Sequence, residues 1–334
     1  GCPIADRSTP LGQGIGKEYA ISVHASGKEP GVVFFSDRTA VAMHILDIFN
    51  QHPTTFSFEF FPPKTAQASE ELFQSISQLQ ELQPSFVSHE LIVRIQSETH
   101  LTAISHLTSV CHTREELAAI LDRYAASGIE NILALRGDPP HNQAHYDRTH
   151  DAFQYAEELV RFIASHPNVP DPRGFGIGVA GFPEGHPATP NRLKELDYLK
   201  RKVDAGAHYI CTQLFFDNRD YYDFRERCEL AGITVPIIAG IMPITSRQGM
   251  VRMADLALGA RFPARLIRAI ERCAPDYSTE QVSKVGIHWA TEQCRDLLDS
   301  HVRGIHFYTL NKSNATRQIY ENLGVKDSIA LRSS

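Results

Sequence analysis

The sequence contains no uninterrupted apolar stretch near the roughly 20 residues that a membrane-spanning helix needs, so we expect no membrane partner. It also lacks an excess of positive charge, because 33 Lys and Arg stand against 39 Asp and Glu, and 33 − 39 gives −6. Nucleic-acid-binding proteins usually carry the opposite sign, so we expect no nucleic-acid partner. The six cysteines are scattered and form no CxxC pair, which favours reduced thiols and a cytoplasmic location.

From Thr54 onward the chain alternates between short apolar strands and helical runs. The pattern predicts strands at 55–61, 85–88, 103–107, 131–135, 175–180, 209–215, 235–239 and 304–308. It predicts helices at 67–82, 89–98, 114–127, 152–165, 191–205, 219–231, 246–256, 262–272, 279–299 and 313–323. Eight βα units favour an α/β fold with a single (β/α)₈ TIM barrel. The alternative is a doubly wound sheet, which usually has fewer strands and a phosphate-binding glycine fingerprint after the first one.

The chain divides into three parts on this interpretation. We assign 48–327 to the barrel, which is the catalytic domain, and 328–334 to a C-terminal tail. Residues 1–47 show weak periodicity and are interpreted as a loosely packed or flexible N-terminal extension. The glycines at 12, 14 and 16 resemble part of a nucleotide-binding fingerprint, but no predicted strand precedes them.

Polar residues follow several strands, where a barrel would gather them at one mouth. Glu59 lies in an otherwise aromatic strand, and burial there would raise its pKa toward the range useful for a general acid. The alternative for Glu59 is a surface-facing position on an alternating strand. His106 ends the third predicted strand, although a single histidine in such a place is more often structural.

Further candidates follow the fourth, fifth and sixth strands. Arg136 and Asp138 flank Gly137, which would let the backbone approach a ligand, or else the two charges form an ion pair that closes a turn. The segment 181–187 contributes an aromatic ring, a carboxylate and an imidazole. Gln213 could bind a planar heterocycle through paired hydrogen bonds.

Two other clusters are weaker. His141, His145 and His150 lie within ten residues, but their spacing fits neither a helix pair nor a strand pair, so we expect no metal. Arg201 and Lys202, with Lys194 and Lys200, form either a solvated helix face or a group that reaches a cofactor phosphate. The sequence leaves these two interpretations open.

Six segments together resemble the methylenetetrahydrofolate reductase family, of the bacterial, FAD-dependent type. They are FSFEFFPPK (56–64), ALRGDPP (134–140), GHP (185–187), LKRKVDAGA (199–207), TQLFFD (212–217) and HFYTLN (306–311). The match runs in order from about 48 to 326. The resemblance implies a flavin-containing barrel of one-carbon metabolism, which reduces 5,10-methylenetetrahydrofolate to 5-methyltetrahydrofolate with NADH or NADPH by a ping-pong mechanism and feeds methionine synthesis. It also implies a homo-oligomer, either a dimer or a tetramer.

The resemblance also assigns roles to individual residues. Glu59 matches the general acid, Asp138 the carboxylate that faces flavin and pterin, and Gln213 an amide shared by folate and nicotinamide. Lys312 takes the place of a folate-contacting Arg; it keeps the charge but lacks the bidentate fork. The positions implied to contact FAD are His106, Arg136, Gly137, Asp138, Phe182, His186, Glu195, Tyr198, Arg201 and Lys202.

The chain departs from the family in a few places. A Thr-Tyr-Gly-Ala loop normally follows the segment Phe86-Val87-Ser88; either it is deleted here, or its residues are missing from the sequence between Ser88 and His89. The family often has Tyr at the position of Phe182, and it has a smaller polar residue at the position of Tyr198. Two alternatives compete with the flavoenzyme: direct hydride transfer from NADH to folate without flavin, and a catalytically silent barrel that binds folate or a partner subunit.

Overall fold

The computed structural model describes residues 43–60, 66–84, 86–88, 101–138, 146–257, 259–274, 276–309 and 311–332. Residues 39–334 form one compact unit, and the following concerns that unit. The extension up to residue 42, its glycines, the helix expected at 89–98 and the histidines at 141 and 145 lie outside the described residues.

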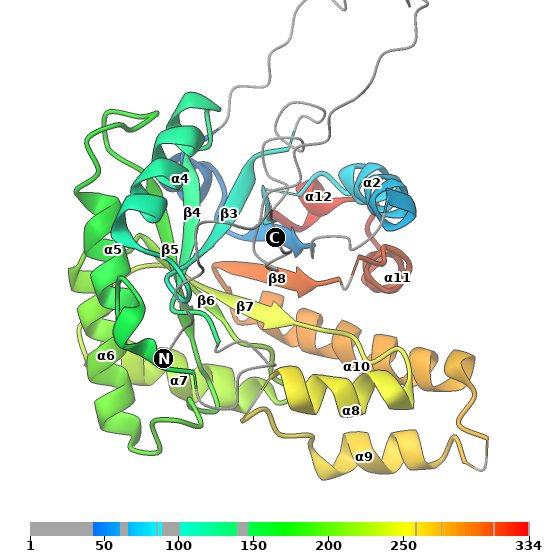
Figure 1. Ribbon diagram of the computed structural model, residues 1–334. Coiled ribbons are helices and arrows are strands. Elements are labelled where there is room, and N and C mark those ends of the chain that lie inside the picture. Colours follow the sequence, from blue (N-terminus) through cyan, green and yellow to red (C-terminus); the bar gives the residue numbers. More distant parts are fainter. Residues whose placement is uncertain are drawn as a thin grey trace, which may run out of the picture. The chain divides into compact units, whose positions relative to one another are not determined.

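The strands form a closed barrel in which every neighbouring pair is parallel (Figure 1). They are β1 (Thr55–Glu59), β2 (Phe86–Ser88), β3 (Ala103–Thr108), β4 (Asn131–Leu135), β5 (Gly176–Gly181), β6 (Tyr209–Thr212), β7 (Ile237–Ile241) and β8 (Gly304–Tyr308). The expected parallel α/β barrel is therefore confirmed as a fold type. Two strands end earlier than expected, β1 at Glu59 and β6 at Thr212, so that Gln213 lies in a loop.

Helix α1 precedes the first strand, and the other helices alternate with or follow the strands along the chain. The helices are α1 (Ile45–Gln51), α2 (Ala66–Gln80), α4 (Arg114–Ala126), α5 (Ala156–Ala164), α6 (Arg192–Asp204), α7 (Asn218–Leu230), α8 (Arg247–Leu256), α9 (Ala264–Glu271), α10 (Thr279–Asp299), α11 (Asn314–Asn322) and α12 (Ser328–Arg332), with a 3₁₀ turn η1 at Arg148–His150. Helix α4 begins with the expected capping box, in which Thr113 and Glu116 each accept a hydrogen bond from the other's backbone N–H.

The two faces of β1 and β8 have different chemistry. On the outer face Phe58 and Phe307 are fully buried, and both rings contact Tyr320 of α11. The inner face carries Ser57 and His306, which are hydrogen-bonded across the strand pair. At β1 and β8, large apolar side chains on the outer face therefore attach the helices, whereas the inner face carries polar groups.

Helix α1 closes the base of the barrel, at the amino-terminal ends of the strands. Ile45, Ile48 and Phe49 pack in one apolar cluster with residues of the barrel interior, among them Tyr209. The side-chain oxygen of Asn131, at the start of β4, accepts a 2.7 Å hydrogen bond from the Ile45 N–H. The predicted boundary at residue 47 is therefore wrong, because the extension as predicted includes the buried first turn of this helix.

Small residues on β5 make this closure possible. A Cβ added to Gly176 would lie 2.7 Å from Ile45 Cγ2, and one added to Gly178 would lie 2.2 Å from the Tyr209 ring. Glycine usually weakens a strand, but it is required at these two positions because Ile45 and Tyr209 occupy the space that any larger side chain would need.

Within the predicted C-terminal tail, residues 328–332 form helix α12. The backbone N–H and the hydroxyl of Ser328 both donate to the Leu82 carbonyl oxygen, and Leu331 is buried. Within the described part of the chain, no helix is both long and apolar enough to cross a membrane.

Candidate functional site

A cavity of about 890 Å³ opens at the carboxyl ends of the strands. This volume lies in the range of about 300–1,000 Å³ that is usual for small-molecule sites. Of the residues expected at the site, all but one line this cavity: Glu59, His106, Arg136, Gly137, Asp138, Phe182, His186, Glu195, Tyr198, Arg201, Lys202 and Gln213. The exception is Lys312, which is exposed in the turn before α11.

Glu59 points into the barrel and is held by two histidines. Its Oε2 lies 3.3 Å from His306 Nε2 and 3.9 Å from His106 Nε2, and its side chain is 9% exposed. The other ring nitrogen of His306, Nδ1, lies 2.7 Å from the Ser57 hydroxyl. A neutral His306 can therefore accept from Ser57 and donate to Glu59. The surface-facing alternative for Glu59 is wrong.

The electrostatics of this cluster favour a neutral imidazole at His106. Burial lowers the pKa of His106; the Glu59 carboxylate opposes this shift, and His306 adds to it. The sequence motif around His306 was noticed, but the residue was not predicted as part of the site. The sequence feature that could have indicated His306 is the alternation of residues along β8, which puts His306 and Tyr308 on the inner face.

A tight turn after β4 presents Arg136 and Asp138. Gly137 has φ +81°, and an added Cβ would lie 2.4 Å from Val110 Cγ1, so only glycine fits. Its carbonyl oxygen accepts a hydrogen bond from Arg148. Burial lowers the pKa of Arg136, as does Arg148, while Asp138 opposes the shift. The turn thus sets a guanidinium group inside the cavity and an exposed carboxylate beside it.

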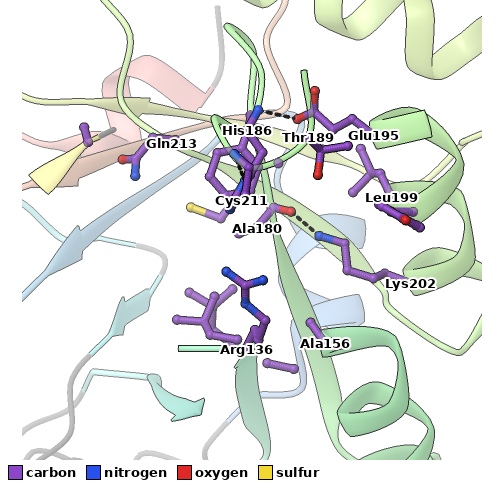
Figure 2. Close-up of a pocket in the computed structure, with 18 of the residues that line it drawn as sticks. Arg136, Ala156, Ala180, His186, Thr189, Glu195, Leu199, Lys202, Cys211 and Gln213 are labelled. Atoms are coloured by element: carbon purple, nitrogen blue, oxygen red, sulfur yellow. Dashed lines mark hydrogen bonds between the residues drawn. The ribbon is translucent and has the colours of Figure 1, made fainter. Parts of the chain in front are cut away.

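The wall formed by β5, the following loop and α6 carries basic, acidic and apolar side chains, among them Lys202, His186, Glu195 and Leu199 (Figure 2). Lys202 donates a 2.6 Å hydrogen bond to the Ala180 carbonyl oxygen, and burial lowers its pKa to about 8. Glu195 accepts from the His186 N–H at 3.0 Å. Burial lowers the pKa of His186, and the nearby Arg136 and Lys202 lower it further. A neutral imidazole therefore lies beside two cations.

The basic cluster on α6 separates into two sets. Arg201 pairs with Asp197 at 2.8 Å and Lys200 with Asp204 at 2.5 Å, with solvent-exposed groups in both pairs. These residues form the solvated face, although Arg201 also reaches the cavity. Lys202 alone among them is directed inward by its bond to β5.

An aromatic pair lies at the same side of the cavity. The rings of Tyr155 and Tyr198 are 6.0 Å apart, and the Arg201 guanidinium lies 5.8 Å from the Tyr198 ring centroid. The sequence analysis did not predict Tyr155, which comes directly before α5 and lines the cavity. A planar heterocycle can stack on such rings.

Gln213 lies on the other side of the cavity from Lys202 (Figure 2). Its backbone N–H donates to the Gly181 carbonyl oxygen at 2.8 Å, and its Oε1 accepts from the Leu214 N–H at 2.9 Å. Beside it the Tyr308 hydroxyl donates to the Thr212 carbonyl oxygen at 2.8 Å. These bonds fix the end of β6 and the direction of the carboxamide.

Among the described residues, no group of three His, Cys, Asp or Glu side chains is placed to hold a metal ion. The buried Cys211 thiol, which also lines the cavity, has a pKa raised by burial and stays neutral.

The family model and the similar proteins all point to the same family. The family model described as methylenetetrahydrofolate reductase matches residues 44–324. The chain is 38% identical over 305 residues to "Methylenetetrahydrofolate reductase (NADH) 1" of Arabidopsis thaliana, covering 85% of this chain and 50% of that protein. It is 36% identical over 307 residues to 5,10-methylenetetrahydrofolate reductase of Escherichia coli K12, covering 88% and 98%. The chain thus spans about half the length of the plant relatives it matches.

A solved structure supports the fold alone. It is an uncharacterized protein from Clostridium thermocellum that binds two copies of 5-methyl-5,6,7,8-tetrahydrofolic acid. The alignment has a TM-score of 0.56 at 13% identity and covers 84% of this chain and 99% of that one.

Proposed function

Because the chain belongs to the methylenetetrahydrofolate reductase family, we propose that it reduces 5,10-methylenetetrahydrofolate to 5-methyltetrahydrofolate through bound FAD. One observation carries the proposal: an inward-facing Glu59, bonded to His306, shares a single cavity with Gln213 and with the basic residues of its wall. The electron donor is NADH or NADPH, and the names of the plant relatives favour NADH. The folate ligand named for the Clostridium protein is in keeping with this substrate class.

The residues of the cavity fit FAD. Arg136 and Lys202 provide positive charge for its diphosphate, and at a pKa of about 8 Lys202 is still mostly protonated at neutral pH. Tyr155, Tyr198 and Phe182 offer faces or edges to planar rings. When bound, FAD supplies hydride chemistry between the nicotinamide and the folate. The protein supplies binding, orientation and protons.

We assign the proton transfer to Glu59. Opening the five-membered ring of the substrate requires a proton on the departing nitrogen, and a buried carboxyl group is a suitable source. His306 and Ser57 fix its direction, because each is joined to the next by a hydrogen bond. Proton uptake from solvent then restores the acid for the next turnover.

Three further residues act on the substrate in this proposal. Ring opening leaves an iminium cation, and the negative charge of Asp138 stabilises it. The Gln213 carboxamide, held by its bond from Leu214, binds the pterin and, in its turn, the nicotinamide. Lys312 attracts the anionic part of the folate from the exposed turn where it lies.

Membership of the family also leads to proposals about the complete barrel, the location, the oligomer and the kinetics. We propose that the full barrel contains eight βα units with the helix at 89–98, and that the enzyme works in the cytoplasm as a dimer or tetramer. One shared cavity requires the two substrates to alternate, which gives ping-pong kinetics. The product would feed methionine synthesis.

The test is an absorbance spectrum of the purified protein under anaerobic conditions. We expect a flavin spectrum that bleaches on addition of NADH or NADPH and returns on addition of 5,10-methylenetetrahydrofolate. A colourless protein that still oxidises NADH in the presence of the folate would replace this mechanism by direct hydride transfer. A protein that binds folate without any NADH oxidation would overturn the proposed activity.

A further inference from the structure

Outside the cavity, Arg261 links three segments that are distant in sequence. Its backbone N–H and its Nε both donate to Glu184 Oε1, at 2.9 and 3.0 Å. Its Nη2 donates to Asp220 Oδ1 at 2.6 Å. Glu184 belongs to the loop after β5, Asp220 to the first turn of α7 and Arg261 to the linker between α8 and α9. One side chain therefore fastens the linker to the other two segments.

Glu184 makes this link stronger than an ordinary surface ion pair. Its side chain is only 5% exposed, although that of Arg261 is 65% exposed. Burial raises the pKa of Glu184, and the bonds from Arg261 oppose that rise. Its second oxygen, Oε2, is buried and has no hydrogen-bond partner among the described residues. A buried carboxylate whose bonds come from one arginine becomes costly when that arginine is removed.

The two loops also meet through their backbones. A Cβ added to Gly259 in the linker would lie 3.0 Å from the Gly185 carbonyl oxygen, and Gly259 has φ +97°. Phe262, next to Arg261, stacks on Phe216 with ring centroids 4.6 Å apart. The linker is thus itself anchored, and it gives Arg261 a firm base from which to hold Glu184.

The loop that Arg261 holds carries part of the cavity wall. Phe182 and His186 flank Glu184, line the cavity and contact each other with ring centroids 4.7 Å apart. From the α6 and α7 side, Glu195 accepts from the His186 N–H, and Arg227 donates to the Pro183 carbonyl oxygen. Arg261 holds the loop from the side of the linker.

We propose that Arg261 is a positioning residue that fixes the loop from Phe182 to His186 in its ligand-binding form and so determines how tightly FAD is retained. The identity of the ligand rests on the function proposed above, whereas the hold on the loop does not. Arg261 lies behind the loop and acts through Glu184, so it requires no contact with the cofactor.

The experiment compares Arg261→Gln with the wild-type protein in two measurements. Flavin fluorescence during titration of the FAD-free protein gives the dissociation constant, which we expect to rise about tenfold because a charge-assisted contact is lost. Hydrogen–deuterium exchange of the peptide 181–188 in the FAD-free protein is expected to become faster. The second measurement does not depend on which cofactor binds.

Two further variants make the result specific. Arg317→Gln removes another ion pair between distant segments, since Arg317 of α11 pairs with Glu81 at 3.3 Å on other elements of the fold; it should leave both measurements unchanged. The double variant Glu184→Gln/Arg261→Gln also removes the buried negative charge that needs the arginine. Compared with Arg261→Gln alone, it should restore most of the affinity for FAD and the slow exchange of the peptide 181–188. This rescue also shows that the single variant did not simply misfold.

Unchanged exchange and an unchanged FAD dissociation constant in Arg261→Gln would overturn the inference. So would a double variant no better than the single one, because a general structural defect is not relieved by neutralising Glu184. Faster exchange of 181–188 in a protein whose wild type binds no FAD would support the hold on the loop but overturn the proposed cofactor.

Discussion

Glu59→Gln separates the two halves of the proposed reaction. The substitution removes the titrating proton but keeps the shape of a side chain that is 9% exposed. The carboxamide oxygen can still accept a hydrogen bond from His306 Nε2, which lies 3.3 Å from the carboxylate oxygen. The cavity and the bound FAD should therefore be preserved.

The size of the effect follows from the surroundings of Glu59. A general acid typically contributes about 10²–10⁴-fold. His106, 3.9 Å away, is a candidate to replace it, but burial lowers its pKa and keeps it neutral, so it is a poor proton source. We therefore expect a loss toward the upper end, about 10³–10⁴-fold, in the reaction with 5,10-methylenetetrahydrofolate. Reduction of the flavin by NADH needs no acid at the folate nitrogen and should keep its rate.

Stopped-flow absorbance of the flavin measures each half-reaction by itself under anaerobic conditions. The variant should bleach with NADH at the wild-type rate and then fail to regain colour with the folate. Equal FAD content and an equal melting temperature are the controls. If both half-reactions slow by the same factor, Glu59 serves to position the flavin and its assignment as the acid is wrong.

Three other perturbations test the site and its support. Asp138→Asn removes a negative charge beside the proposed flavin, so the midpoint potential should rise and folate reduction should slow; dye-equilibration spectroscopy measures the potential. Asn131→Ala removes the acceptor of the Ile45 N–H at the base of the barrel, and urea unfolding should show a loss of about 1–3 kcal/mol. His208, which accepts from the Ile177 N–H, has a pKa lowered by burial from 6.5 to about 4, so it binds more protons when unfolded. Stability should therefore be complete above pH 6.5 and fall toward pH 4, by about 2 kcal/mol after allowance for its partial exposure; a His208→Gln variant should lose this part of the pH dependence.

Much of the barrel could be predicted because each strand is bounded by turn residues and followed by a helical period. The carboxyl ends of parallel strands converge, so residues such as Glu59, Arg136 and Gln213 could be grouped before their distances were known. The expected helix at 279–299 agrees with α10 in both bounds. Local sequence signals were sufficient to predict the bounds of an element where that element is long or its ends are capped.

Tertiary contacts decided the features that the sequence did not predict. His306 lies 247 positions from Glu59, and no local pattern reports that the two meet. Helix α1 has only seven residues, too few for a clear period, and Ile45 is buried because the barrel base accepts it. Likewise Glu184 was seen as one carboxylate in a loop, whereas its bond to Arg261 joins residues 77 positions apart.

The closure of the barrel has a consequence for the order in which the protein can be made. Strand β1 pairs with β8, so the first strand to leave the ribosome waits for the last. The Phe49 carbonyl oxygen in α1 accepts from Arg303, 254 positions later. Until that part of the chain has been synthesised, one edge of β1 and the Phe49 carbonyl oxygen have no partner, and an exposed strand edge invites association between nascent chains. Ribosome-bound chains that stop before residue 304 should therefore depend on chaperones and be cut readily by proteases, and protection should come only with the final strand.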